Sequence, residues 1–150
     1  KNFIRKIKDL GLAVKLDTNG SNPAVLKELI TEGLLDYVAM DIKHSRAKYA
    51  SVACSPSFNL DDIAESVDFL KEGHVDYEFR TTLVKEMHRE ADMTAIGMWL
   101  MGAKAYYLQP YRDSDTVICP GYHAHSREEL DTFVKILSAF LPKVELRGDI

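Results

Sequence analysis

Hydrophobic and polar residues alternate along the chain with two different periods. Strands are indicated where apolar residues recur at every second position, as in residues 12–17, 35–43 and 75–84, and by the short segments 105–111 and 144–147. Helices are indicated where apolar residues recur at every third or fourth position, which happens in residues 1–10, 23–33, 59–73, 90–102 and 126–142. The pattern therefore predicts that helix and strand alternate strictly along the chain.

Capping side chains mark the starts of three of these helices. Asn22 stands before a proline that suits the first helical position, and Asn59 stands before the next helix. Ser126 and Glu129 have the spacing of a capping box, in which each side chain binds the backbone of the other residue. These signals support the predicted helix starts.

Strict alternation is typical of an α/β fold in which parallel strands are joined by right-handed crossovers. Both an open doubly wound sheet and a (β/α) barrel, or part of one, have this order. The predicted strands carry polar residues at alternate positions, for example Lys15 and Asp17 or Glu78 and Arg80, whereas a sheet covered on both faces is more continuously apolar. We therefore expect a partial (β/α) barrel with a parallel sheet of about five strands, formed by residues 1–150 as a single domain.

The chain opens within a predicted helix and has no initiator methionine. We expect from this that the chain has been cut from a longer protein. Truncation would leave the strand at 12–17 as an unpaired sheet edge, so self-association is also expected.

Composition narrows the class of protein further. The 150 residues are 46% hydrophobic and 28% charged, with a net charge of −4, which is typical of a globular domain. The sequence contains neither the long apolar run of a membrane span nor a basic stripe for nucleic acid, so we expect no membrane or nucleic-acid partner. Cys54 and Cys119 are isolated, which favours a reducing cytoplasm and an incidental role for both over a role as ligands.

Polar residues gather where the first two predicted strands end. Asp17-Thr18-Asn19-Gly20 follows the first strand, at the rim where active sites of βα units collect, although Asn-Gly is also an ordinary turn. Asp41 and Lys43 end the second strand on one face of the pleat. Because burying a carboxylate is costly unless it is paired or binds a cation, these residues indicate either a ligand or cation site or a structural ion pair.

The later strands add further candidate residues. Arg80 lies on the third strand, and its planar guanidinium suits a carboxylate partner. It could serve a ligand or simply pair with Glu78 or Asp41. Gln109 and Arg112 stand at the end of the fourth strand.

Five segments together resemble the radical S-adenosylmethionine activating enzymes. They are LDTNG at 16–20, YVAMDIK at 37–43, FRTTLV at 79–84, QPY at 109–111 and VELRG at 144–148. The sequence is most similar to the activase of the anaerobic ribonucleoside-triphosphate reductase, and pyruvate formate-lyase activase is a close cousin. The resemblance implies a partial (β/α)6 barrel, an S-adenosylmethionine cofactor and a [4Fe–4S] cluster.

The cluster motif of the family, C-x3-C-x2-C, is absent from this sequence, as is its GGEP motif. The resemblance therefore implies a C-terminal fragment that is inactive alone and forms no stable cluster with Cys54 and Cys119. In the whole enzyme, the resemblance implies reductive cleavage of S-adenosylmethionine and formation of a glycyl radical on a partner enzyme.

The resemblance also assigns roles to individual residues. It places the aspartate of the DTNG segment, with Thr18 and Asn19 beside it, and the Asp41–Lys43 pair at the cofactor. Arg80 faces the cofactor, and Gln109 and Arg112 stand nearby, with Arg112 in place of a histidine of the pyruvate formate-lyase branch. In that branch, the two aspartates and Thr18 would also hold a monovalent cation. We expect a cation, water or Lys43 to bridge Asp17 and Asp41.

Two other functions remain open from the residues alone. One is a metal- or phosphate-binding (β/α) barrel enzyme fragment, and the other is a non-catalytic α/β binding or regulatory module. His123 and His125 lie just before the Ser126 cap, where a solvated loop is favoured over a metal site.

Overall fold

The computed structural model describes residues 1–53, 58–113 and 120–148. Its sheet has five parallel strands in the order β1-β2-β3-β4-β5. The strands are β1 Lys15–Thr18, β2 Tyr37–Asp41, β3 Asp76–Leu83, β4 Tyr106–Pro110 and β5 Val144–Leu146. This confirms the predicted parallel sheet, in which each strand lies beside its neighbour in sequence.

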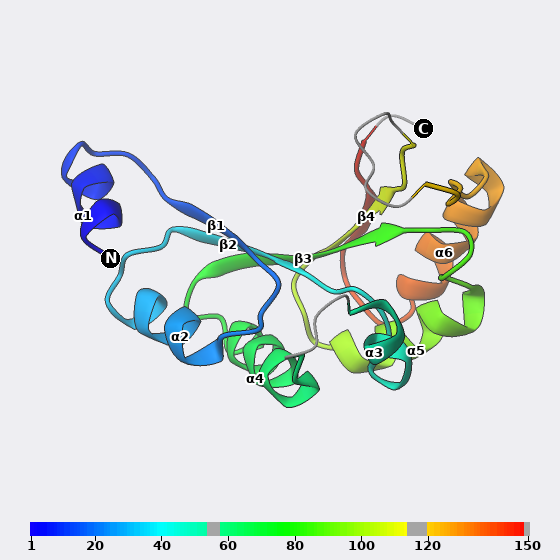
Figure 1. Cartoon of the computed structure of the whole chain (residues 1–150), viewed down its shortest axis with the longest axis horizontal. Helices are drawn as coiled ribbons and strands as arrows, with labels where there is room; N and C mark the ends of the chain where they lie inside the picture. Colours follow the sequence, from blue (N-terminus) through cyan, green and yellow to red (C-terminus); the bar gives the residue numbers. More distant parts are fainter. Residues whose placement is uncertain (54–57, 114–119, 149–150) are drawn as a thin grey trace.

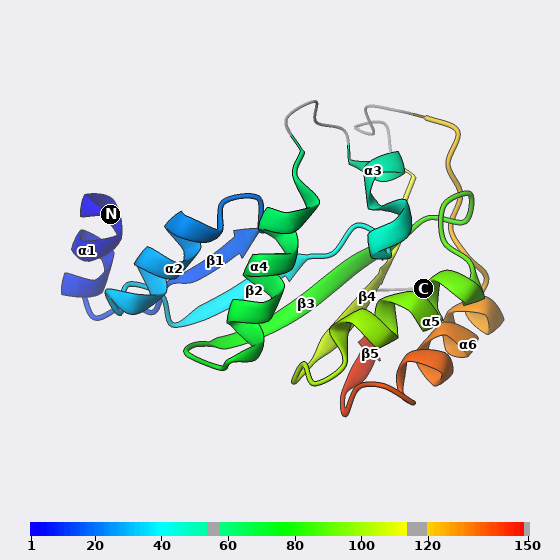
Figure 2. The same ribbon diagram turned by 90° about the horizontal axis from the view of Figure 1, so that it is seen from below.

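Helices cover one face of this sheet and leave the other open (Figure 1). The helical segments are α1 Asn2–Asp9, α2 Pro23–Thr31, η1 Arg46–Lys48, α3 Tyr49–Val52, α4 Leu60–Lys71, α5 Glu90–Leu100 and α6 Arg127–Leu137. The helices from α2 to α6 lie on the same side, and Figure 2 shows them from that side. A doubly wound sheet has helices on both faces, so the arrangement is that of an open (β/α) sheet.

The strand register sorts side chains onto the two faces. Asp17 pairs with Ala39, Asp41 with Arg80, and Arg80 with Tyr107, so these positions share the open face. The face toward the helices carries the intervening apolar residues, and the fully buried ones among them include Val38, Met40, Ile42, Phe79, Leu83, Tyr106 and Leu108. One face is thus the core and the other is available for polar chemistry.

The predicted caps are present in the structure. The side chain of Asn22 accepts a hydrogen bond from Val25 N, and that of Asn59 accepts one from Asp61 N. Ser126 and Glu129 form the expected capping box, with bonds of 3.2 and 2.7 Å. Local chemistry therefore fixes these helix starts.

Two local features of the structure were not indicated by the sequence patterns. The short helices η1 and α3, between β2 and α4, have no repeating apolar pattern and were not predicted. In α1, none of the residues is buried, and Phe3 is 74% exposed. Ion pairs from Lys1 and Arg5 to Glu32 hold this helix beside α2, so it adds little to the core.

We expect the chain to self-associate through β1, which is an edge of the described sheet with Leu12 exposed beside it. Sedimentation should give a mass that rises above 17.0 kDa with concentration. Leu12→Lys should reduce this rise, and Met98→Lys, at another exposed apolar position on α5, should not. A constant monomer mass at high concentration would contradict the prediction.

Candidate functional site

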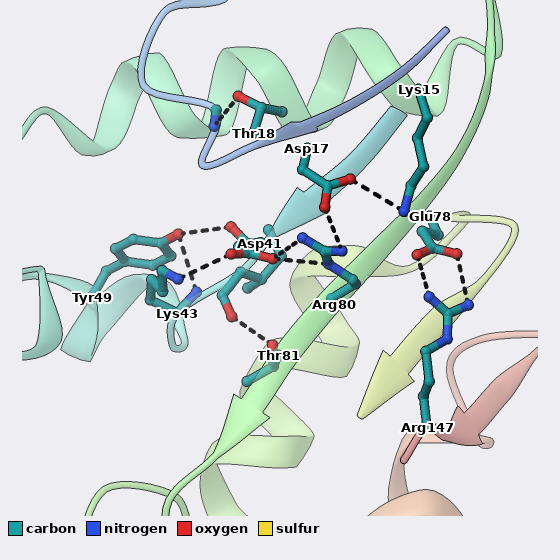
Figure 3. A network of polar contacts seen from close by, with 12 residues as sticks. Lys15, Asp17, Thr18, Asp41, Lys43, Tyr49, Glu78, Arg80, Thr81 and Arg147 are labelled. Carbon is teal, nitrogen blue, oxygen red and sulfur yellow. Dashed lines mark hydrogen bonds and ion pairs between the residues drawn. The ribbon is translucent and has the colours of Figure 1, made fainter. Parts of the chain in front are cut away.

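Three of the predicted site residues meet on the open face at the carboxyl ends of β1, β2 and β3. Arg80 donates from Nε to Asp41 Oδ1 at 3.0 Å and from Nη1 to Asp17 Oδ2 at 3.1 Å. Figure 3 shows the guanidinium lying between the two carboxylates. The expected convergence of Asp17, Asp41 and Arg80 is therefore present.

The bridge between the aspartates differs from the expected one. Arg80 contacts both carboxylates, whereas Lys43 Nζ contacts Asp41 at 3.1 Å and Lys15 Nζ contacts Asp17 at 3.2 Å. The reason is geometric, because a planar fork presents donors in two directions and an ammonium is a single point. The guanidinium supplies the positive charge that the cation was expected to supply.

This arrangement keeps Asp17 ionised. Burial alone would raise the pKa of its carboxyl, but the contacts with Lys15 and Arg80 outweigh burial and hold the pKa below its ordinary value. The same two aspartates raise the pKa of Arg80 against the opposing effect of burial. Asp17 and Arg80 therefore both carry their charges at neutral pH.

Thr18 and Asn19 serve the loop rather than this cluster. Thr18 lies on the other side of the pleat from Asp17, and its hydroxyl accepts from Gly20 N at 3.1 Å (Figure 3). Asn19 Oδ1 accepts from Ser21 N at 2.9 Å. The Thr18 hydroxyl is thus directed to the loop backbone, and a cation site formed with Asp17, Asp41 and a nearby carbonyl stays a prediction.

Gly20 has a φ of +74°, which favours glycine, and its carbonyl accepts from Ser66 of α4. A Cβ there would lie 2.0 Å from Met40 Cε. Backbone conformation and close packing together fix the loop that follows Asp17.

Buried side chains make hydrogen bonds to the backbone of the Asp41–Lys43 segment. The Tyr49 hydroxyl accepts from Lys43 N at 3.1 Å and donates to Asp41 O at 3.4 Å. Burial raises the pKa of Tyr49 to about 12, so this hydroxyl stays protonated. His88 donates from Nε2 to Lys43 O at 3.0 Å, while its Nδ1 accepts from Val84 N. Sequence reasoning missed both residues, because no local signal links them to Lys43.

A second ionic cluster lies on the same face toward β5. Arg147 donates two hydrogen bonds to Glu78, at 2.5 and 2.9 Å (Figure 3). Tyr37 donates a third to Glu78 at 2.9 Å. The Arg147 guanidinium also stacks 3.6 Å from the centre of the Tyr107 ring. The VELRG segment contained Arg147, but nothing in the sequence indicated its partner 69 residues away.

The remaining predicted residues stand apart from the aspartates. Gln109 pairs in register with Thr82, one pleat beyond Arg80, and is half-buried. Arg112 is exposed beyond the end of β4, near Gly148. Gln109 therefore lies toward the carboxyl edge of the open face, and Arg112 lies in the segment that follows its strand.

Cys54 and Cys119 lie outside the described residues. Within the described residues, no group of three or more His, Cys, Asp or Glu side chains is placed to hold a metal ion. Among the same residues, no helix has the length and apolar character needed to cross a membrane.

The fold and the position of the charged cluster together indicate the structural class of the protein. A sequentially ordered parallel sheet, with helices on one face and charged residues at its carboxyl edge on the other, is a segment of a (β/α) barrel with the usual position of a barrel site. No family model matches the chain.

Two known proteins are similar to the chain. The Methanocaldococcus jannaschii protein named "Putative glycyl-radical enzyme activating enzyme MJ1227" is 35% identical over 114 residues, which are 74% of this chain and 48% of that protein. The crystal structure of a domain of pyruvate-formate lyase-activating enzyme from Bacteroides vulgatus matches with a TM-score of 0.76 at 15% identity, over 98% of this chain and 88% of that one. The chain is thus a relative of glycyl-radical enzyme activating enzymes and spans about half the length of its curated relative.

Proposed function

We propose that this chain forms the part of a radical S-adenosylmethionine activating enzyme that holds S-adenosylmethionine. The observation that carries the proposal is the Asp17–Arg80–Asp41 cluster, with Lys43 beside it, at the carboxyl edge of the open face. The similarity to a protein named as a glycyl-radical enzyme activating enzyme supports the same function.

The charges of this cluster suit the methionyl end of S-adenosylmethionine. A carboxylate can bind to Lys43 or Arg80, and an ammonium or a ribose hydroxyl can bind to Asp17 or Asp41. The cofactor supplies the radical chemistry when it is bound. The chain itself binds and orients S-adenosylmethionine. Tyr49 and His88 fix the position of Lys43 through hydrogen bonds to its backbone.

The described residues include no cysteine and so provide no thiolate for a [4Fe–4S] cluster. In this proposal the cluster is held by another part of the enzyme, and the chain alone is inactive. The partner is a glycyl radical enzyme, with anaerobic ribonucleoside-triphosphate reductase preferred over pyruvate formate-lyase, and the enzyme works in the cytoplasm.

The proposal is tested by S-adenosylmethionine binding in a complete enzyme that carries this chain. Asp17→Ala or Asp41→Ala should each weaken binding by roughly tenfold or more, the value of one lost charge-assisted hydrogen bond. Calorimetric titration gives the affinity, and the visible absorbance of the cluster should not change, because neither residue binds iron.

Asp76→Ala is the matched control. Asp76 lies at the opposite end of β3 and is 78% exposed, so its loss should leave S-adenosylmethionine affinity unchanged. If the aspartate variants lose only stability and bind the cofactor like this control, the cluster is a structural ion pair and the proposal fails.

A further inference from the structure

His125 is buried without a hydrogen-bond partner. Its side chain is 3% exposed, and both ring nitrogens lack a hydrogen bond within the described residues. Glu129 Oε2 lies 3.5 Å from Nδ1, which is within the range of an ion pair, but it makes no hydrogen bond there. The solvated loop expected from the sequence fits His123, which is 73% exposed, but not His125. Because buried polar groups are normally hydrogen-bonded, an unsatisfied imidazole indicates a missing partner.

The ring of His125 lines a hollow of about 300 Å³ between the starts of α5 and α6. The polar residues that line it are Lys85, His88, Arg89, Glu90, His125 and Glu129. Phe133 supplies an apolar wall, with its ring 4.8 Å from that of His125 in an edge-to-face arrangement. The hollow lies on the helix side of the sheet, away from the Asp17–Arg80–Asp41 cluster.

Hydrogen bonds join the two chain segments that border this hollow. Lys85 N donates to His123 O at 3.0 Å, and Glu86 accepts from both the backbone and the ring of His123. The segment after β3 and the segment before α6 are thereby fixed against each other. The shape of the hollow is therefore fixed by these hydrogen bonds.

The groups around the hollow favour a negatively charged ligand. His88 is already committed to Lys43 O and Val84 N, which leaves His125 as the unsatisfied imidazole there. Glu129 is also committed, since its carboxylate accepts from Ser126 N at 2.7 Å and lies 3.4 Å from Lys85 Nζ. Lys85 and Arg89 bring positive charge, and the N-terminal ends of α5 and α6 add partial positive charge. Two carboxylates, Glu90 on the same rim and Glu129 at 3.5 Å from His125 Nδ1, oppose this and limit the affinity.

We propose that the hollow binds the oxyanion group of a small ligand, a phosphate or a carboxylate, through His125, Lys85 and Arg89. An oxyanion accepts the imidazole hydrogen bond that the protein leaves unmade and pairs with the two cations. With two opposing carboxylates nearby, a dissociation constant on the order of millimolar or weaker is expected for a minimal anion.

The test is a titration of this chain followed by the nitrogen and proton resonances of the His125 ring. Sodium phosphate, sodium acetate and sodium chloride are added separately at equal pH and ionic strength. A saturable shift of the His125 signals with phosphate alone assigns a phosphate ligand, and one with acetate alone assigns a carboxylate. Equal, unsaturable shifts with all three salts would overturn the proposal.

Two variants separate a site from a general charge effect. Arg89→Gln should weaken binding roughly tenfold, because it removes one charged donor from the rim. Arg127→Gln removes the same charge from the first residue of α6, where Arg127 pairs with Asp131, and should leave binding unchanged. Arg89 is exposed, so the fold survives its replacement, and equal affinity in the two variants would refute the assignment.

Discussion

Arg80→Met is expected to lower the free energy of unfolding by about 2 kcal/mol at neutral pH, less than for a fully buried pair because Asp17 and Asp41 are partly solvated. The substitution keeps the bulk of the side chain but leaves two carboxylates facing each other without the guanidinium between them. Chemical denaturation measures the loss. Arg5→Met, which breaks an exposed pair with Glu32, is the control and should cost little.

The pH dependence of this stability loss tests whether the ion pairs of Arg80 cause it. In the folded protein, the pKa of Asp17 lies below its ordinary value of 3.8, so its ion pairs stabilise the fold above about pH 4 and this contribution is lost as the pH falls through the folded pKa. The stability gap between Arg80→Met and the parent should therefore narrow in acid. Arg80→Lys should recover only part of the gap, and full recovery would show that the forked geometry has no role.

Arg147→Met is expected to destabilise the protein by about 3 kcal/mol, because it leaves the buried carboxylate of Glu78 without its bidentate partner. Glu78 is 4% exposed and Arg147 is 40% exposed, which places this value at the low end for a buried pair. The double variant Glu78→Leu with Arg147→Met should be much closer to the parent, since no buried charge remains. Thermal or chemical unfolding of the three proteins gives the comparison.

The effect of pH on this variant has a defined sign. Burial alone raises the pKa of Glu78, and the hydrogen bonds from Arg147 and Tyr37 reverse this and hold the pKa below its ordinary value of 4.5. Without Arg147 the effect of burial dominates, so protonation in acid relieves the unpaired charge. The destabilisation should be greatest near neutral pH and shrink below about pH 5. A gap that stays constant across this range would mean that lost packing on Tyr107 causes it.

The fold was largely predictable because its signals are local. Alternating and helical periods, the caps at Asn22, Asn59 and Ser126, and the polar positions on one side of the pleat together predicted the parallel sheet of a partial (β/α) barrel. The short helices η1 and α3 were not predicted, because segments of three and four residues have no measurable period. The exposure of α1 could not be predicted, because an apolar period indicates a helix but does not show whether another element packs against it.

The candidate site was predictable only in part. Alternation in parallel strands placed Asp17, Asp41 and Arg80 on one face, which needs no long-range information beyond strand order. The choice of Arg80 over Lys43 as the bridge depends on side-chain reach in three dimensions. The contacts of Tyr49 and His88 with Lys43, and of Arg147 with Glu78, join segments whose proximity no spacing in the sequence reveals.

The sequential strand order also bears on how the chain folds during synthesis. Each strand pairs with the one made just before it, and the intervening helix needs only to pack back on the same side. The entropy of closing each loop is therefore modest, and no strand must wait for a distant partner to leave the ribosome. A nascent chain can extend its sheet one unit at a time, and the newest strand is always the growing edge.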